Sequence, residues 1–205
     1  MKYPVRRFKS LKVALKELEP FIRNGKHLQS GRPFKRFGGM RSREVLVNWL
    51  LCAVFGAESG TERFTFTSDP VAGDGIIHDT TTEETWPTEH VMVPKARGHE
   101  PPDVEALILK AIEGKQKKGG AAYASGKTLV VFSDAGGGAR WLPNKVAKRL
   151  PATDFAAIWV VGLHLAEDGQ YVYGVSELDL IHGTAPTWLV RIAKNFDSWD
   201  VQRLQ

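Results

Sequence analysis

The stretch "GDGIIHDTTTEETWPTEHVMV", from Gly73 to Val93, contains two short apolar runs on either side of a polar segment. "GIIHD" and "TEHVMV" have the composition and alternation of strands, and "DTTTEE" has the composition of a turn. A turn centred between Thr81 and Thr82 places Asp74 directly opposite Glu89. The stretch therefore predicts an antiparallel hairpin with two carboxylates at its open end, roughly 4.5–5.5 Å apart between Cβ atoms.

Like charges directly opposite each other destabilise a strand pair, so these two carboxylates call for a cation between them. Mg²⁺ is usually held by one or two carboxylates together with waters and phosphate oxygens, which makes Asp74 and Glu89 a candidate metal site. Gly73 and Gly75 leave room for another backbone to approach Asp74. The simpler alternative is that Asp74 belongs to a glycine-rich turn and Glu89 is an ordinary surface residue.

The segments before the hairpin predict two helices and one strand. Ser10 is a candidate N-cap for the amphipathic helix "LKVALKEL", which should end near Pro20. Residues 24–42 are rich in glycine and basic side chains and are predicted to form a loop. A second helix, capped by Ser42, beginning at Arg43 and ending at Gly56, is apolar on nearly every side and should be buried. "RFTFTSD", residues 63–69, alternates like a strand.

The segments after the hairpin return to a helical period and then to strands. Apolar residues at helical spacing predict a helix over residues 101–118, with Pro102 in its first turn and Lys115 on the apolar stripe. Two central strands are predicted at residues 127–134 and 155–165, separated by a short helix at 142–150 and followed by a hairpin and edge strands. This order predicts an α/β fold in which helices flank a mixed β-sheet.

The composition fits one globular domain. With 205 residues, of which 42% are hydrophobic, the chain can bury one core but is short for two. The single cysteine, Cys52, excludes an intramolecular disulfide and favours the reducing cytoplasm. No apolar run approaches the roughly 20 residues of a membrane span, so we expect a soluble cytoplasmic protein with no membrane partner.

The net charge of +5 conceals an uneven distribution. Residues 1–45 contain 13 Lys and Arg against 3 acids, a net +10; residues 46–113 contain 4 against 12, a net −8; residues 114–205 contain 11 against 8, a net +3. A basic N-terminal region can contact the phosphates of a polyanion, and an acidic segment can hold cations. Ion pairing between the two segments explains the pattern equally well.

From residue 42 to about residue 179, the order of elements resembles that of the PD-(D/E)XK nuclease superfamily, in which a helix precedes a β-meander and a further helix and strand follow. In this resemblance Asp74 corresponds to the motif Asp and Glu89 to the (D/E) position. Glu44 corresponds to an acid that some members carry on the first helix. The motif is incomplete, because Val91 stands where the family has Lys.

Other residues could replace the missing lysine. The resemblance implies that the following helix can supply it, and Lys115 extends the apolar stripe of that helix; the alternative is that its head group bends around the helix end to solvent. Gln116 beside it is a candidate phosphate contact, and Lys95 is a weaker substitute because it follows a proline. His90 suits a general base near neutral pH, although a packing role is more common, and His78 is weaker still.

The resemblance implies a restriction-endonuclease-like α/β domain at residues 42–205, preceded by a basic helix and loop at residues 1–41. It implies a metal-dependent nuclease that uses Mg²⁺ or Mn²⁺ to hydrolyse phosphodiester bonds. The active site would contain Asp74, Glu89, Lys115 and Glu44, with the metal held by Asp74 and Glu89. Nucleic acid, DNA rather than RNA, would contact Arg32, Lys35, Arg36, Arg41, Arg43 and Gln116. The second hypothesis is a catalytically inactive module of the same fold that binds nucleic acid or a protein partner. The sequence leaves the oligomeric state open.

Two glycine-rich motifs resemble nucleotide-binding loops. "SGKT", residues 125–128, has Ala121 in place of the leading glycine and precedes a strand, so it is not a P-loop. "DAGGGARW", residues 134–141, follows a strand and precedes a helix, and nucleotide binding there is kept as a minor alternative although its spacing matches no dinucleotide fingerprint. Several aromatic residues could stack on bases but are better explained as core and rim residues: Trp159, Trp188, Trp199, Tyr171 and Tyr173.

Overall fold

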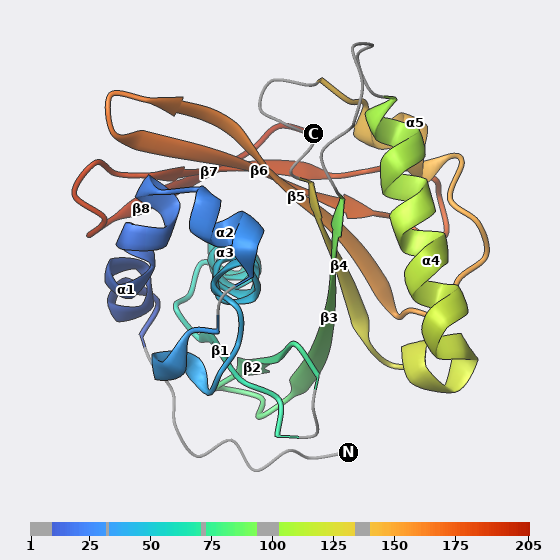
Figure 1. Cartoon of the computed structure of the whole chain (residues 1–205), viewed down its shortest axis with the longest axis horizontal. Coiled ribbons are helices and arrows are strands. Elements are labelled where there is room, and N and C mark those ends of the chain that lie inside the picture. The colour runs from blue at the N-terminus through green and yellow to red at the C-terminus, as the bar shows by residue number, and fades with distance from the viewer. Residues whose placement is uncertain (1–9, 32, 71–72, 94–102, 134–139) are drawn as a thin grey trace.

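The computed structural model describes residues 10–31, 33–70, 73–93, 103–133 and 140–205. It contains one mixed sheet of eight strands with helices on both faces (Figure 1), so the predicted α/β class is confirmed. The helices are α1 (Leu11–Arg23), α2 (Lys26–Ser30), the 3₁₀ helix η1 (Lys35–Phe37), α3 (Ser42–Ser59), α4 (Val104–Ala124) and α5 (Pro143–Ala147). The strands are β1 (Phe64–Thr67), β2 (Gly75–Asp79), β3 (Thr85–Val93), β4 (Thr128–Ser133), β5 (Ala157–Glu167), β6 (Gln170–Leu178), β7 (Thr187–Ile192) and β8 (Trp199–Arg203).

The strands follow one another across the sheet in sequence order, from β1 to β8. β1, β2 and β3 form an antiparallel meander, β4 is parallel to β3, and β5 is parallel to β4. Parallel neighbours need a crossover connection, and α4 and α5 lie in the two crossovers. The remaining strands pair antiparallel. β4 and β5 are therefore central, as the sequence predicted.

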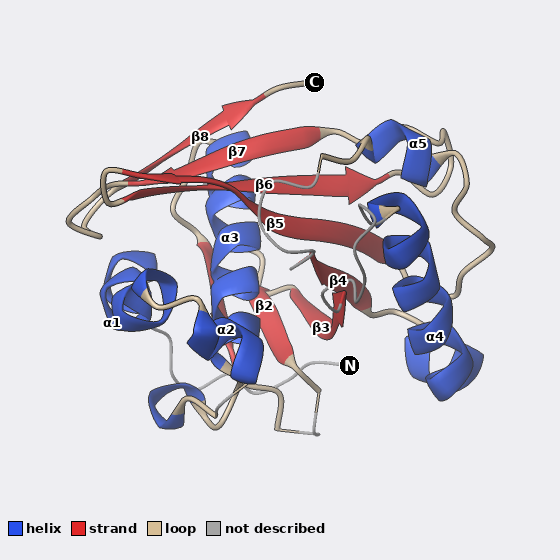
Figure 2. Ribbon diagram, turned by 45° about the horizontal axis from the view of Figure 1, so that its top comes forward, coloured by secondary structure: helices blue, strands red, loops and turns tan. Residues whose placement is uncertain are grey.

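The sheet curls around α3, which contacts strands from both of its edges (Figure 2). One apolar cluster joins α1 and α3 to the inner face of the curled sheet, and a second lies between its outer face, α4 and α5. The protein is thus built in layers, with the sheet between two helical layers. Among the described residues, no helix is both long enough and apolar enough to cross a membrane.

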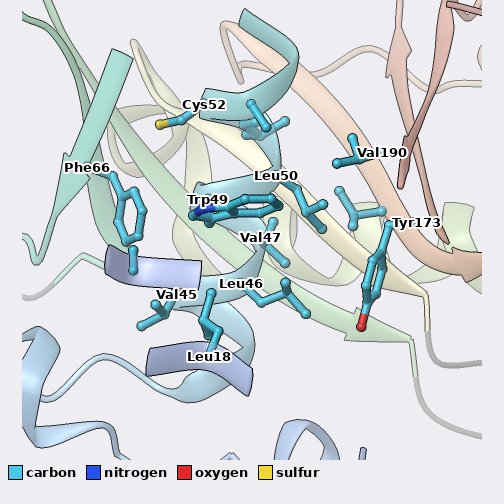
Figure 3. Packing of buried hydrophobic residues seen from close by; sticks show 14 of the residues in the cluster. Leu18, Val45, Leu46, Val47, Trp49, Leu50, Cys52, Phe66, Tyr173 and Val190 are labelled. Atoms are coloured by element: carbon cyan, nitrogen blue, oxygen red, sulfur yellow. The ribbon is translucent and has the colours of Figure 1, made fainter. Parts of the chain in front are cut away.

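The central helix α3 is buried, as its apolar sequence predicted. Every residue from Val45 to Val54 is buried, and Trp49 and Leu50 lie at the centre of the inner cluster (Figure 3). The predicted cap at Ser42 and the predicted end at Gly56 were both wrong. Ser42 is the first residue of the helix, and Arg41 is its N-cap. The helix continues to Ser59 and ends where Gly60 adopts a left-handed conformation with φ of 63°, because glycine is tolerated within a helix but favoured at such a turn.

The region before α3 is more helical than predicted. Ser10 caps α1 by accepting the Val13 N–H, as expected, but the helix continues past Pro20 to Arg23. Burial of Ile22 in the inner cluster favours this continuation over the break that proline usually causes. The segment predicted as a loop contains α2 and η1, whose burial of apolar side chains likewise overrides their composition.

Both elements around the candidate site begin close to their predicted positions. In the β2–β3 hairpin, Gly75 lies opposite Thr88, so Asp74 and Glu89 are the next pair in the same register and the predicted register is confirmed. Helix α4 begins after Asp103, whose carboxylate caps the Ala106 N–H at 2.9 Å. Pro102, predicted in its first turn, lies outside the described residues. The helix extends beyond the predicted residue 118 to Ala124, with a kink at Gly120.

Candidate functional site

The candidate site lies at the open end of the β2–β3 hairpin, where β2 begins but β3 continues beside it. There the backbone of His90 has no β2 residue opposite it in the ladder. Its N–H donates to Asp74 Oδ2 at 2.7 Å, and its carbonyl oxygen accepts from Lys115 Nζ at 3.1 Å. Side chains of Asp74 and Lys115 thus replace the missing strand partner.

Glu89 projects from β3 toward α4 and is surrounded by donors. Its Oε1 lies 2.8 Å from Lys127 Nζ, and its Oε2 lies 3.1 Å from Lys115 Nζ and accepts a hydrogen bond from the Tyr123 hydroxyl. Only 6% of the Glu89 side chain is exposed. Lys115 and Tyr123 of α4, together with Lys127 directly before β4, therefore stabilise one buried carboxylate.

Lys115 joins the two acids. Its Nζ lies 3.1 Å from Glu89 and 3.8 Å from Asp74 Oδ2, so one ammonium group on α4 lies within reach of both carboxylates. With 18% of its side chain exposed, Lys115 points inward as the apolar stripe indicated, and does not bend away to solvent. The cation that the opposed carboxylates require is supplied in this structure by an ammonium group.

The two carboxylates differ in their acidity. Burial alone raises the pKa of Glu89, but the hydrogen bonds from Lys127, Tyr123 and Lys115 outweigh it, and the pKa lies below its ordinary value. Burial raises the pKa of Asp74, and the hydrogen bond from His90 and the charge of Lys115 offset this only in part. A pair of acids whose pKa values move in opposite directions is typical of catalytic sites.

Asp74 is positioned by a polar contact with α3. Asn48, which is fully buried, donates from Nδ2 to the Asp74 carbonyl oxygen at 3.5 Å and accepts the Thr88 hydroxyl at 2.9 Å. Gly75 has a φ of 155°, and a Cβ there would lie 2.4 Å from Asn48 Nδ2. Glycine is therefore required for the hairpin to approach α3 this closely.

Glu44 lies at the first turn of α3, where its Oε2 accepts the Arg41 N–H at 2.7 Å. Burial raises its pKa, and the nearby charge of Asp74 raises it further. Arg43 is half-buried, and its charge interacts with both Glu44 and Asp74. The structure thus places Glu44, Arg43 and Arg41 close to Asp74, on the α3 side of the site.

The remaining predicted binding residues lie apart from this cluster. Arg36 pairs with Glu17 at 3.3 Å, and Lys35 is exposed on η1. Gln116 is bound to the segment before β5, where its Oε1 accepts the Thr153 hydroxyl at 3.2 Å. The two remaining basic candidates, Arg32 and Lys95, lie outside the described residues.

The two candidate histidines are both buried. His90 points to the α3 side, opposite to Glu89, and its ring nitrogens lack a hydrogen-bond partner among the described atoms. Burial is the main cause that lowers the pKa of His90 to about 3, so the ring is neutral at physiological pH. Its Nδ1 lies 3.8 Å from Asp74 Oδ2. His78 lies opposite Thr85, toward the turn of the hairpin.

Sequence reasoning missed three residues of the site: Asn48, Tyr123 and Lys127. Lys127 belongs to the "SGKT" segment and to the strand predicted at residues 127–134. It directly precedes β4 and shares the strand parity of Leu129, but the register that places Leu129 opposite Glu89 is a tertiary feature. Tyr123 and Asn48 carried no comparable signal, because Tyr123 follows the kink in α4 and Asn48 lies inside an apolar helix.

The site is rich in oxygen ligands but contains few acids. The described residues include no cluster of three or more histidine, cysteine or acidic side chains suited to a metal ion. The oxygens that converge on Lys115 come from Asp74, Glu89 and the carbonyl of His90.

No protein-family model matches the chain, and no curated protein or solved structure shows significant similarity to it.

Proposed function

We propose that this protein is a metal-dependent nuclease that hydrolyses phosphodiester bonds, with a restriction-endonuclease-like domain of the PD-(D/E)XK type. The observation that carries the proposal is that carboxylate oxygens of Asp74 and Glu89 both lie within 3.8 Å of Lys115 Nζ, at the open end of the β2–β3 hairpin. Two acids and a lysine at one point are the groups that such hydrolysis needs. Asp74 directly precedes β2, Glu89 lies on β3 and Lys115 lies on α4, so local structure alone does not explain why these side chains meet.

The arrangement of the elements supports the proposal. Helix α3 precedes the meander β1–β2–β3, and α4 and β4 follow, with β4 parallel to β3. This is the order that the resemblance implies. The acids also occupy the corresponding places: Glu44 on the helix, Asp74 before β2 and Glu89 on β3. The lysine comes from α4 in place of the motif position, which is occupied by Val91.

The chemistry of the donors fits a hard divalent cation. Carboxylate and carbonyl oxygens are the ligands that Mg²⁺ and Mn²⁺ prefer, and Asp74, Glu89 and the His90 carbonyl would supply them. A metal bound there lowers the pKa of a water molecule and stabilises negative charge on the phosphate. Lys115 and Lys127 would offset the charge that develops on the phosphate oxygens.

Basic side chains at the start of α3 and on η1 would hold the rest of the substrate. Arg41 and Arg43 lie at the start of α3 beside the acids, and Lys35 and Arg36 lie on the preceding η1. Such residues bind phosphates without reading the base sequence. We propose DNA as the nucleic acid.

A cleavage assay tests the proposal. The purified chain should cleave plasmid or single-stranded DNA with Mg²⁺ or Mn²⁺, and EDTA should stop the reaction. Asp74→Asn and Glu89→Gln should each lower the rate of cleavage by about 10³-fold, while Glu113→Gln, a change at an exposed acid on α4, should not alter it. The proposal fails if the wild-type chain cleaves no nucleic acid with either metal.

One observation favours a second function, a catalytically inactive module that binds nucleic acid. Both oxygens of Glu89 already have partners in Lys127, Lys115 and Tyr123, and the strand lacks the motif lysine. Binding of DNA by the wild-type chain without turnover in any metal would support this second function. Loss of that binding on removal of Arg41 and Arg43 would place the contact beside Asp74.

A further inference from the structure

A hollow lies on the outer face of the sheet next to α5, beyond the C-terminal end of β3, whose last residue, Val93, pairs with the lining residue Ser133. Its volume is about 620 Å³, within the range of small-ligand pockets. Figure 1 shows α5 at the top of the molecule and the β1–β2 meander at the bottom. The hollow is lined by the end of β4, the segment leading into α5, and β5, β6 and β7. It shares no residue with the candidate nuclease site.

Part of the floor of this hollow is bare backbone, at two glycines. Gly162 of β5 and Gly174 of β6 lie directly opposite each other, and Leu189 of β7 lies beside Gly174. Neither glycine has a positive φ, so backbone conformation does not require glycine at either position. A glycine inside a strand weakens it and often marks a place where a ligand or another backbone approaches closely.

Packing explains one of these glycines but not the other. A Cβ on Gly162 would lie 3.2 Å from the Ser133 carbonyl oxygen, which leaves little room. A Cβ on Gly174 would meet nothing closer than the Gly162 carbonyl oxygen at 4.0 Å. Among the described residues, the space above Gly174 is therefore open, although a side chain would fit there and strengthen the strand.

The walls of the hollow suit a planar ring that bears an anion. Its charged and ionisable lining residues among the described part of the chain are Arg140 and His164, with no carboxylate. Trp141 and Leu189 contribute apolar surface, and Ser133 adds a hydroxyl. An aromatic side chain and bare peptide groups favour stacking of a flat ring, and a guanidinium favours a phosphate.

We infer that this hollow, the glycine-floored pocket, binds a nucleoside 5′-phosphate, with the base over Gly162 and Gly174 beside Trp141 and the phosphate at Arg140. The nucleotide is either free or the 5′-terminal nucleotide of a strand. The inference is independent of the proposed nuclease activity, because the pocket shares no residue with that site and needs no metal.

Isothermal titration of the full chain with AMP, in EDTA, tests the inference. AMP should bind, while adenosine and inorganic phosphate should each bind at least about tenfold more weakly. A dinucleotide with a 5′-phosphate distinguishes the two sources: tighter binding than AMP identifies a strand end, and weaker binding identifies the free nucleotide. No heat of binding for AMP, GMP, CMP, UMP or the dinucleotide at about 1 mM overturns the inference.

Two variants locate the site. Gly174→Val fills the space over the floor and should weaken AMP binding at least about tenfold, with an unchanged or higher melting temperature because valine favours strands. Arg140→Ala should weaken AMP binding but leave adenosine binding unchanged, and Arg149→Ala, an exposed arginine outside the pocket, is the matched control. If Gly174→Val does not fold, AMP binding by Arg140→Ala alone tests the inference. AMP binding that survives Arg140→Ala, or survives a folded Gly174→Val, overturns the inference.

Discussion

The two ends of the β2–β3 hairpin each contain a buried carboxylate, and the two are held differently. At the turn, Asp79 accepts the backbone N–H groups of Thr81 at 2.8 Å and Thr82 at 3.2 Å, and pairs with Arg63 at 3.0 Å. Burial alone raises the pKa of Asp79, but these hydrogen bonds and the charge of Arg63 lower it. Its hydrogen-bond donors are neighbours in sequence, and their role is to close the turn.

At the open end, the partners of Glu89 are distant in sequence. Tyr123 and Lys127 follow it by 34 and 38 residues, and Lys115 lies on the intervening helix. None of these contacts closes a turn or caps a helix. A buried carboxylate that contacts cations from distant parts of the chain, without a role in a turn or a helix cap, is typical of a functional site. A carboxylate that accepts hydrogen bonds from neighbouring backbone N–H groups is typical of a turn.

The largest expected effect is a difference in DNA cleavage between variants at the open end of the hairpin and variants at its turn. Asp74→Asn and Glu89→Gln should lower the rate of metal-dependent DNA cleavage by about 10³-fold, because the metal supplies several kcal/mol of transition-state stabilisation. Asp79→Asn should keep the rate per folded molecule. Initial rates of plasmid nicking, corrected for the folded fraction by circular dichroism, measure both. Equal losses at the two ends would remove the distinction between them.

A smaller effect is expected from the residue that positions Asp74. Asn48→Ala removes the amide that contacts the Asp74 carbonyl, and should weaken Mn²⁺ binding by about 10–100-fold, as loss of outer-shell contacts commonly does. Isothermal titration with Mn²⁺ measures this, with Asp79→Asn as the control. If the wild-type chain binds Mn²⁺ and Asn48→Ala binds it equally well, Asn48 has only a packing role.

The lowered pKa of Glu89 predicts a stability effect with a definite pH dependence. Glu89→Gln should lower the free energy of unfolding by about 1–3 kcal/mol near pH 7, because two partly buried lysines lose their partner. The difference in unfolding free energy between the wild type and Glu89→Gln should be fully present above pH 4.5, the ordinary pKa of a glutamate. It should vanish as the pH falls through the lowered pKa of Glu89 in the folded protein. Urea unfolding at several pH values measures it. A difference that persists in acid would have another origin.

The smallest effect has the opposite sign. The raised pKa of Asp74 means that its ionised form is disfavoured in the folded protein, so Asp74→Asn should raise the melting temperature at pH 7 by about 1–4 °C. The gain should disappear below pH 3.8, where the carboxyl is protonated even in the unfolded chain. Thermal melts at pH 7 and pH 3 measure it. A lower melting temperature at pH 7 would show that Asp74 is held as a structural acid, like Asp79.

Sequence patterns predicted most of the elements and the central geometry of the site. Alternation and turn composition placed Asp74 opposite Glu89, and helical period placed Lys115 on the inner stripe of α4; both placements agree with the structure. The errors lie where tertiary burial overrides local preference. Proline at position 20 does not end α1, and the glycine-rich segment after it is partly helical, because both regions bury apolar side chains against α3.

By itself, the sequence determined what depends on neighbours in the chain: the strands and turn of the hairpin, its register, the buried central helix and the order of elements. Only the tertiary structure decided which further groups contact and position the two acidic residues, because Lys127, Tyr123 and Asn48 reach the site through the parallel pairing of β4 with β3 and the packing of α3 and α4. Contacts across such separations depend on how whole elements pack, and a local pattern of residues does not encode them.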